Sequence, residues 1–217
     1  MSGTIGELLA AACQRYRGRL ALVRGGKTRS YGELLDHGAR VANALRGAGL
    51  APGTPVAAML EDRIASPEVY VGAAFGGYPV IHINDRLAAP EVAHILADSG
   101  AHVLFHTDGR SEVVAAAAAQ AELRLLVTIG AERPAGSMGF DELVTSARSA
   151  LQITPIADGD LAIVGYTSGT TGLPKGAISQ RALTDCVRLS QRTCIRSSQS
   201  STLVRRRPGC MCRSWSR

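Results

Sequence analysis

Short apolar runs alternate with helix-forming segments along most of the chain, and this alternation constrains the fold more than any other feature. A short apolar run bounded by turn residues fits a buried strand, whereas apolar residues three or four apart fit a helix. With a helix between successive strands, a layered α/β structure is expected, with a mostly parallel sheet and flanking helices. The expected strands are 55–60, 79–83, 102–106, 124–129, 161–164 and 176–180. The expected helices are 31–46, 90–98, 112–122, 140–150 and 181–192, with another that Ser66-Pro67-Glu68 caps and that has Pro67 at its first position.

The helix over 31–46 carries the clearest local signal. Ser30 and Glu33 have the spacing of a capping box, in which each side chain accepts a hydrogen bond from the other residue's backbone N–H. An apolar-periodic stretch follows, and Gly47 marks its end. The sequence therefore predicts both ends of this helix.

The net charge comes from the C-terminal end of the chain. The 217 residues contain 24 Lys and Arg against 18 Asp and Glu, a formal charge of +6. Residues 195–217 hold six arginines and no acid, which leaves 18 bases and 18 acids in the remainder. A basic domain that binds along the phosphates of a nucleic acid is therefore not expected.

The cysteines and the N-terminus indicate a cytoplasmic protein. Four of the five cysteines fall in the last 32 residues and only Cys13 lies elsewhere, which does not fit a disulfide framework. Glu7 interrupts the first apolar stretch, and no apolar run approaches the ~20 residues of a membrane span. We expect a soluble cytoplasmic chain with no secretory signal and no transmembrane segment.

One segment combines glycines, hydroxyl side chains and a lysine directly after an expected buried strand. Residues 166–176 read Tyr-Thr-Ser-Gly-Thr-Thr-Gly-Leu-Pro-Lys-Gly, and Lys175 is one of two lysines in the chain. Glycines let backbone N–H groups converge on an anion, hydroxyl groups add donors, and lysine supplies a positive charge. This segment predicts a polyphosphate site, with a Gly/Ser/Thr linker as the alternative. Its spacing is not that of the common nucleotide loop, which needs Gly-Lys followed by Ser or Thr.

Residues 166–176 resemble the phosphate-binding signature of the adenylate-forming superfamily, which includes acyl-CoA synthetases, luciferases and the adenylation domains of peptide synthetases. Residues 30–34, 75–87 and 91–101 resemble earlier blocks of that family, so the resemblance covers about residues 5–193. Asn84-Asp85-Arg86-Leu87 is more similar to the Asn-Pro-Arg-Leu of acyl-CoA synthetases than to the peptide-synthetase version. The resemblance favours a fatty acid as substrate and implies that residues 1–193 are a partial N-terminal AMP-binding domain.

The resemblance implies a two-step reaction that uses ATP, Mg²⁺ and coenzyme A. A carboxylic acid reacts with ATP to give an acyl-adenylate and pyrophosphate, and the acyl group then passes to the coenzyme A thiol. Lys175 would be the catalytic residue, acting by charge rather than by proton transfer. The residues implied to bind the β- and γ-phosphates are Thr167, Ser168, Gly169, Thr170, Thr171, Gly172 and Lys175.

The departures from the family pattern are as informative as the match. Arg181 stands where family members commonly have histidine, and Asp85 stands where they have proline. The later blocks for adenine, ribose and Mg²⁺, and the small C-terminal domain with its own lysine, have no counterpart. We therefore expect an incomplete, inactive acyl-CoA synthetase, with a non-catalytic ATP-binding remnant or regulatory fragment as the alternative. Strands without their later partners would leave apolar surface exposed, so self-association or chaperone binding is expected.

No metal site is predicted. The histidines at 82, 94, 102 and 106 lack a compact ligand pattern, and Cys210-Met211-Cys212 has no second pair.

Residues 194–217 break the pattern of the rest of the chain. They are rich in Arg and Ser, contain no acid and show neither helical nor strand periodicity. A shifted reading frame in a GC-rich gene produces such a segment, and we favour this origin. The rival hypothesis is an arm that binds nucleic acid or another acidic partner through Arg205-Arg206-Arg207.

We predict that this tail is disordered, because it cannot bury enough apolar surface to offset the entropy of ordering. Limited proteolysis should remove residues beyond about 195 before it cuts elsewhere. Protection of Arg205–Arg207 equal to that of strand 161–164 would contradict the prediction.

Overall fold

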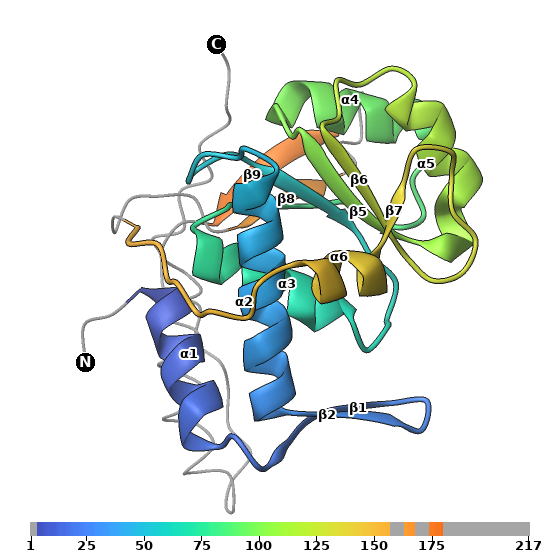
Figure 1. The fold of residues 1–217 in the computed structure, drawn as a ribbon. Coiled ribbons are helices and arrows are strands. Elements are labelled where there is room, and N and C mark those ends of the chain that lie inside the picture. The colour runs from blue at the N-terminus through green and yellow to red at the C-terminus, as the bar shows by residue number, and fades with distance from the viewer. Residues whose placement is uncertain (1–3, 157–162, 168–173, 180–217) are drawn as a thin grey trace, which may run out of the picture.

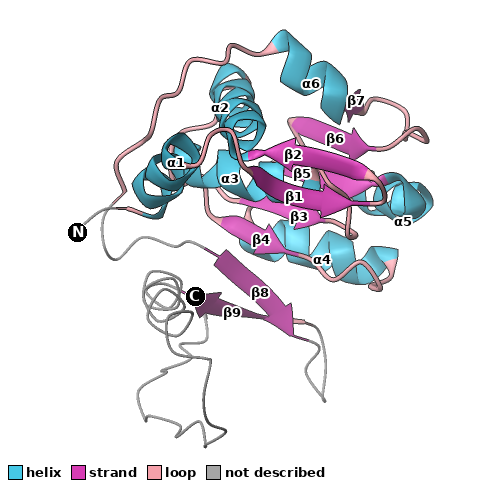
Figure 2. Cartoon of the chain, turned by 90° about the horizontal axis from the view of Figure 1, so that it is seen from below, coloured by secondary structure: helices cyan, strands magenta, loops and turns pink. Residues whose placement is uncertain are grey.

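A seven-stranded sheet forms the centre of the molecule (Figures 1 and 2), in a computed structural model that describes residues 4–156, 163–167 and 174–179. The strand order is β7-β6-β5-β3-β4-β8-β9, and every neighbouring pair is parallel except β8 and β9. The strands are β3 (Val56–Met59), β4 (Val80–His82), β5 (Val103–Thr107), β6 (Leu125–Ile129), β7 (Met138–Gly139), β8 (Ile163–Thr167) and β9 (Lys175–Ser179).

Helices cover both faces of this sheet (Figure 2). On one face, α2 (Tyr31–Gly47), α3 (Ser66–Gly76) and α6 (Phe140–Ser146) form a core with alternate residues of the strands. On the other face, α4 (Ala89–Ser99) and α5 (Ser111–Ala118) pack against the remaining strand residues, and a 3₁₀ turn at Asp108–Arg110 precedes α5. The α1 helix (Ile5–Arg15) packs against α2 and α3. The expected layered α/β fold with a mostly parallel sheet is confirmed.

A separate two-stranded hairpin, β1 (Leu20–Arg24) and β2 (Lys27–Ser30), connects α1 to α2. Gly25 and Gly26 form its turn with φ of 54° and 75°, a conformation that favours glycine. In Figure 1 the hairpin extends away from the rest of the molecule. We did not predict α1, this hairpin or β7 from the sequence.

Most predicted elements lie within two residues of their observed positions. The capping box of α2 is present, because Glu33 N donates to Ser30 Oγ at 3.2 Å and Ser30 N donates to Glu33 Oε2 at 2.7 Å. The expected helix over 112–122 ends earlier, at Ala118, and the expected helix over 181–192 lies outside the described residues, as does the tail. None of the helices in the described ranges combines the length and apolar character that a membrane span requires.

The expected helix over 140–150 ends at Ser146, because α2 holds the following chain in an extended form. Arg40 Nη1 donates to the carbonyl oxygens of Val144 at 3.2 Å and Ala147 at 2.7 Å. Asn43 Nδ2 donates to the carbonyls of residues 148 and 150. Side chains more than a hundred residues away therefore satisfy these carbonyls, so the chain after Ser146 does not need further helical hydrogen bonds.

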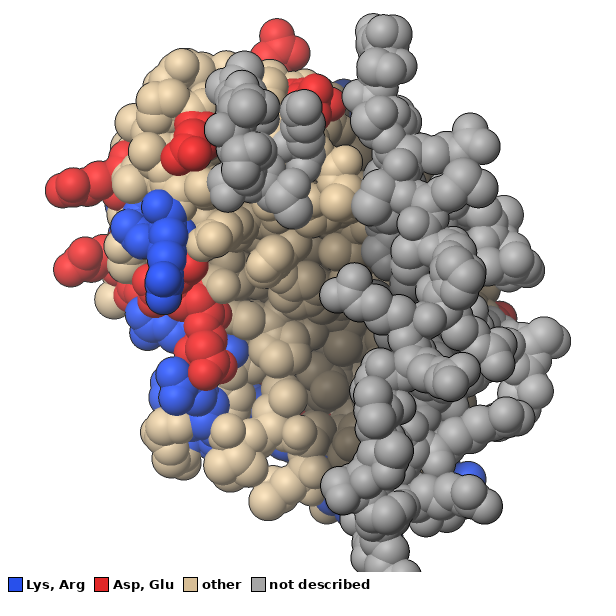
Figure 3. All heavy atoms as spheres, turned by 180° about the vertical axis from the view of Figure 1, so that it is seen from behind, with Lys and Arg blue, Asp and Glu red and all other residues tan. Residues whose placement is uncertain are grey.

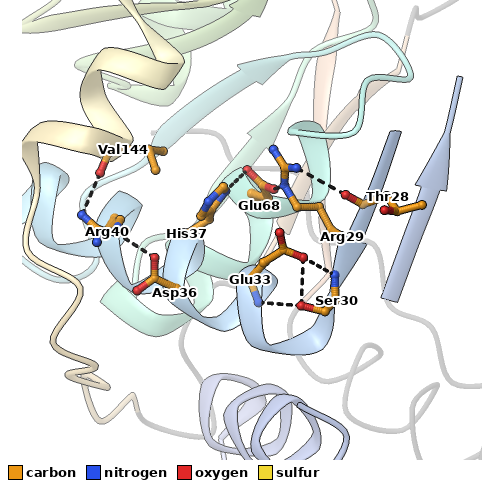
Figure 4. A network of polar contacts seen from close by, with 9 residues as sticks. All are labelled: Thr28, Arg29, Ser30, Glu33, Asp36, His37, Arg40, Glu68 and Val144. Carbon is orange, nitrogen blue, oxygen red and sulfur yellow. Dashed lines mark hydrogen bonds and ion pairs between the residues drawn. The ribbon is translucent and has the colours of Figure 1, made fainter. Parts of the chain in front are cut away.

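The Glu68 carboxylate joins three elements beneath the hairpin (Figure 4). Its side chain is fully buried on α3, and it accepts from Arg29 Nε of β2 at 2.9 Å and contacts His37 Nδ1 of α2 at 2.9 Å. A buried carboxylate with no partner would be costly, so these two contacts hold β2, α2 and α3 in register.

We predict that Arg29→Met lowers the free energy of unfolding by about 3 kcal/mol, because it leaves the buried Glu68 carboxylate with one partner fewer. Urea denaturation of the full chain measures this change. The matched control is Arg24→Met, whose ion pair with Asp62 is exposed and should contribute less than about 1 kcal/mol. Equal losses in the two variants would show that the buried contact is not what stabilises this region.

Candidate functional site

The two ends of the glycine- and hydroxyl-rich segment face each other across a pair of antiparallel strands. Strand β8 ends at Thr167 and β9 begins at Lys175, and these two residues are direct partners in the ladder. The structure thus places the backbone of both. Of the other predicted site residues, Ser168, Gly169, Thr170, Thr171 and Gly172 lie outside the described residues.

The sheet places this segment at the edge where ligands of parallel sheets bind. Strand β8 runs parallel to β4, with His82 opposite Gly165, so both strands end at the same edge. In open parallel sheets, ligands bind beyond the carboxyl ends of the strands. Thr167 closes β8 at this edge, and the segment that follows β4, Asn84-Asp85-Arg86, begins there too. The glycine- and hydroxyl-rich segment and the Asn84-Asp85-Arg86 segment therefore follow adjacent strands, β8 and β4.

Tyr166 fixes the end of β8 to the helix layer beside it. Its hydroxyl donates to Asp98 Oδ2 on α4 at 2.6 Å. Burial and this bond to a carboxylate both raise the pKa of Tyr166, so the hydroxyl stays protonated as a donor. The ring needs space on the neighbouring strand, and Gly176 provides it: a Cβ there would lie 3.3 Å from the Tyr166 ring. Tyr166 and Gly176 of the motif thus have a packing role.

The turn after β4 is ordered by its own polar groups. Asn84 Oδ1 accepts from the backbone N–H of Arg86 at 3.0 Å, and Glu91 Oε2 accepts from the N–H of Ala88 at 2.9 Å at the start of α4. Proline is therefore not required at Asp85 to shape this turn, because the asparagine side chain organises it.

A polar cavity of about 660 Å³ lies at the carboxyl ends of β3 and β6. Its charged groups largely neutralise one another: Arg63 is 3.4 Å from Glu61 and 2.9 Å from Asp108, and Arg133 is 3.3 Å from Glu142. We did not predict this cavity, because its walls come from residues far apart in the sequence.

Three of the four histidines considered from the sequence have local hydrogen-bond partners. His106 is fully buried, with Nδ1 3.0 Å from the Thr107 carbonyl and Nε2 2.8 Å from Thr128 Oγ1, and burial lowers its pKa. His82 Nδ1 lies 2.8 Å from the Tyr70 hydroxyl, and His102 Nδ1 lies 2.9 Å from the carbonyl of Glu122. Within the described ranges, no three His, Cys, Asp or Glu side chains are grouped as metal ligands.

An apolar cavity of about 410 Å³ runs along α3 beside the first residue of β8. Its walls include Tyr70, Tyr78, Val80 and Ile163. In Figure 3 the uncharged part of the visible face is hollowed, next to residues that are not described.

Known proteins of similar sequence are named as CoA synthases and acid ligases. A feruloyl-CoA synthase of Amycolatopsis sp. is 39% identical over 158 residues, which cover 73% of this chain and 29% of that protein. A fatty acid–[acyl-carrier-protein] ligase of Streptomyces coeruleorubidus is 37% identical over the same shares. A long-chain-fatty-acid–CoA ligase of Mycobacterium tuberculosis is 37% identical over 64% of this chain and 27% of its own length. The chain thus spans about 30% of the length of these relatives.

Solved structures share the fold. An anthranilate CoA ligase superposes with a TM-score of 0.78 at 23% identity, covering 82% of this chain and 35% of that one. The N-terminal domain of a Mycobacterium tuberculosis enzyme named FACL13 superposes with a TM-score of 0.69 at 28% identity, covering 83% and 45%. The sequence profile of a family described as AMP-binding enzyme matches residues 9–204. The profile match and these relatives show that the chain belongs to the AMP-binding enzyme family.

Proposed function

We propose that this chain is the ATP-phosphate-binding part of an AMP-forming acyl-CoA synthetase. The β8–β9 pairing carries the proposal, because it brings Thr167 opposite Lys175 at the carboxyl edge of a parallel sheet. Six residues separate β8 from Pro174, which precedes β9, and three of these six carry a hydroxyl group and two are glycine. A loop of this composition, held at both ends, suits a polyphosphate.

The proposed chemistry follows from what such a loop can stabilise. A carboxylate oxygen of the acid attacks the α-phosphorus of ATP, and the bond from that phosphorus to the bridging oxygen breaks. Pyrophosphate leaves and the acyl-adenylate remains. The thiolate of coenzyme A then attacks the acyl carbon, and AMP leaves. Loop donors and the Lys175 charge would stabilise the negative charge that develops on the leaving pyrophosphate.

Each predicted residue would have a defined part in this reaction. The backbone N–H groups of Gly169 and Gly172 would approach the phosphates closely, since glycine has no Cβ to obstruct them. The hydroxyl groups of Thr167, Ser168, Thr170 and Thr171 would donate to phosphate oxygens. Mg²⁺ would arrive bound to ATP, where it neutralises phosphate charge.

We further propose that the acid is a fatty acid. The support is Asn84-Asp85-Arg86-Leu87, together with relatives named as fatty-acid ligases. Other relatives are named for feruloyl-CoA and benzoate, so an aromatic acid is the competing substrate class. We place the reaction in the cytoplasm, where ATP and coenzyme A are both available.

We also propose that the 217 residues are not sufficient for catalysis. Adenylate formation needs the phosphates, adenine, ribose and acid held together, since most of its acceleration comes from positioning and charge neutralisation. The chain spans about 30% of the relatives' length. Alone it would serve as an ATP-binding fragment.

We predict that the purified chain shows no fatty-acid-dependent exchange of radiolabelled pyrophosphate into ATP. A version of the chain in which the reading frame is restored, so that the later family blocks follow, should show this exchange. In the restored enzyme, Lys175→Ala should lower the exchange rate about 100-fold, the size of effect seen when a preorganised donor is removed. Thr170→Ala should lower it less, because a neutral donor is lost rather than a charge.

The matched control is Lys27→Ala, which removes the only other lysine, an exposed residue of the β1–β2 hairpin. It should leave the exchange rate unchanged. If the 217-residue chain catalyses exchange and Lys175→Ala abolishes it, the chain is sufficient for adenylate formation. Equal rates for Lys175→Ala and Lys27→Ala would remove the loop from the mechanism.

We propose, finally, that this chain self-associates or is retained by chaperones. The apolar cavity along α3 supports this, and so does β9, which pairs with β8 alone among the described strands. Unpaired strand edges and apolar surface favour association. We predict that size-exclusion chromatography with light scattering gives a mass above that of the monomer. A monodisperse monomer with a cooperative thermal transition would contradict this prediction.

A further inference from the structure

The segment from Arg15 to Arg29 concentrates positive charge at one end of the molecule. It holds six arginines and lysines and no acid. Outside this segment and residues 195–217, the chain has twelve bases against eighteen acids. The segment is therefore a basic extension of the chain, in which Arg24 and Arg29 are paired with Asp62 and Glu68.

The same segment holds the most exposed large apolar side chains. Among the described residues these are Tyr16, Leu20 and Val23, with 37%, 64% and 67% of their surface exposed. Single exposed apolar residues are common on proteins, but a group of them within eight positions indicates an interaction surface.

A β-bulge places Leu20 and Val23 on one face of the hairpin. Residues three apart on a regular strand point to opposite faces. Here the register shifts between Leu20 and Leu22, so Leu20 is opposite Ser30 and Val23 is opposite Thr28. Ser30 and Thr28 are two apart on β2, so their partners share a face. Leu22 packs instead against the core formed by α1, α2 and α3.

The guanidinium groups of Arg15 and Arg19 both lie close to the ring of Tyr16. Their Cζ atoms are 5.6 Å and 5.4 Å from the centre of its ring. Such contacts keep an exposed aromatic ring and two positive charges together. Tyrosine with flanking arginines is suited to the boundary between lipid headgroups and hydrocarbon.

The hairpin is held to the body both near its base, through Arg29, and beside its turn, through Arg24. Arg29 pairs with the buried Glu68, and Arg24 pairs with Asp62. Gly25, Gly26 and Lys27 at the turn are exposed, and Figure 1 shows the hairpin extending from the body. An extension fixed in this way presents its side chains without an added ordering cost.

We propose that the surface formed by Arg15–Arg29 binds the surface of an anionic membrane. Leu20 and Val23 insert between headgroups, and Arg15, Arg17 and Arg19 contact lipid phosphates. An acidic protein would be recognised by charge alone, whereas the projecting aliphatic pair favours a lipid surface. Each base near such a surface contributes about fivefold to the binding constant, so three contribute on the order of 100-fold.

The experiment measures sedimentation of the full chain with vesicles of phosphatidylcholine and phosphatidylglycerol, compared with pure phosphatidylcholine. Because the C-terminal arginines could also bind anionic lipid, all proteins carry Arg205→Gln, Arg206→Gln and Arg207→Gln. Binding only to the anionic vesicles is expected. Arg15→Gln/Arg17→Gln/Arg19→Gln should weaken it on the order of 100-fold. The control Arg86→Gln/Arg124→Gln/Arg148→Gln, which removes three other exposed bases, should change it less than about twofold.

A second variant separates lipid insertion from charge attraction. Leu20→Ser/Val23→Ser keeps every base and should weaken vesicle binding at least tenfold, since burying each side chain in lipid is favourable by about 1.5 kcal/mol or more. Circular dichroism verifies that each variant is folded. Unchanged vesicle binding in this variant, or equal loss in the Arg86 control, overturns the proposal. Soluble polyglutamate can also be added to displace the chain from the vesicles. If it displaces the parent chain and Leu20→Ser/Val23→Ser equally well, the partner is an acidic protein instead.

Discussion

The burial of β3 on both faces is the constraint on which the rest of the structure depends. All four residues, Val56–Met59, have no exposed surface, and the strand lies between its parallel neighbours β4 and β5. Parallel strands need crossover helices, and the helices must cover both faces. Because the crossovers return the chain to the amino edge each time, every parallel strand ends at the same opposite edge. Strand β8 ends at that edge, within the glycine- and hydroxyl-rich motif.

Polar contacts between layers fix this arrangement at two places. Glu68 joins β2, α2 and α3, and the Tyr166 hydroxyl joins β8 to Asp98 on α4. The Glu68 contacts hold the basic hairpin against the helices. The Tyr166–Asp98 bond lies next to Thr167, the last residue of β8. The end of β8 and the β1–β2 hairpin are thus each joined to a helix by a hydrogen bond that involves a buried or half-buried side chain.

Local patterns predicted those elements whose ends are set by nearby residues. The capping box at Ser30 and Glu33 gave the start of α2 to the residue. The helix expected over 140–150 was too long, because Arg40 and Asn43 bind carbonyl groups that follow α6. The β1–β2 hairpin was missed although Gly25-Gly26 is a turn signal, since its strands bury little and lack a clear alternation.

The sequence by itself determined the α/β class, the family and the residue types of the phosphate motif, because these depend on periodicity and on one contiguous segment. Only the tertiary structure decided that Thr167 is opposite Lys175, that Tyr166 bonds to Asp98 sixty-eight positions earlier, and that a bulge aligns Leu20 with Val23. Each of these depends on strand register or on helix packing. Register and packing are set by the burial of the whole sheet, which no short stretch of sequence contains.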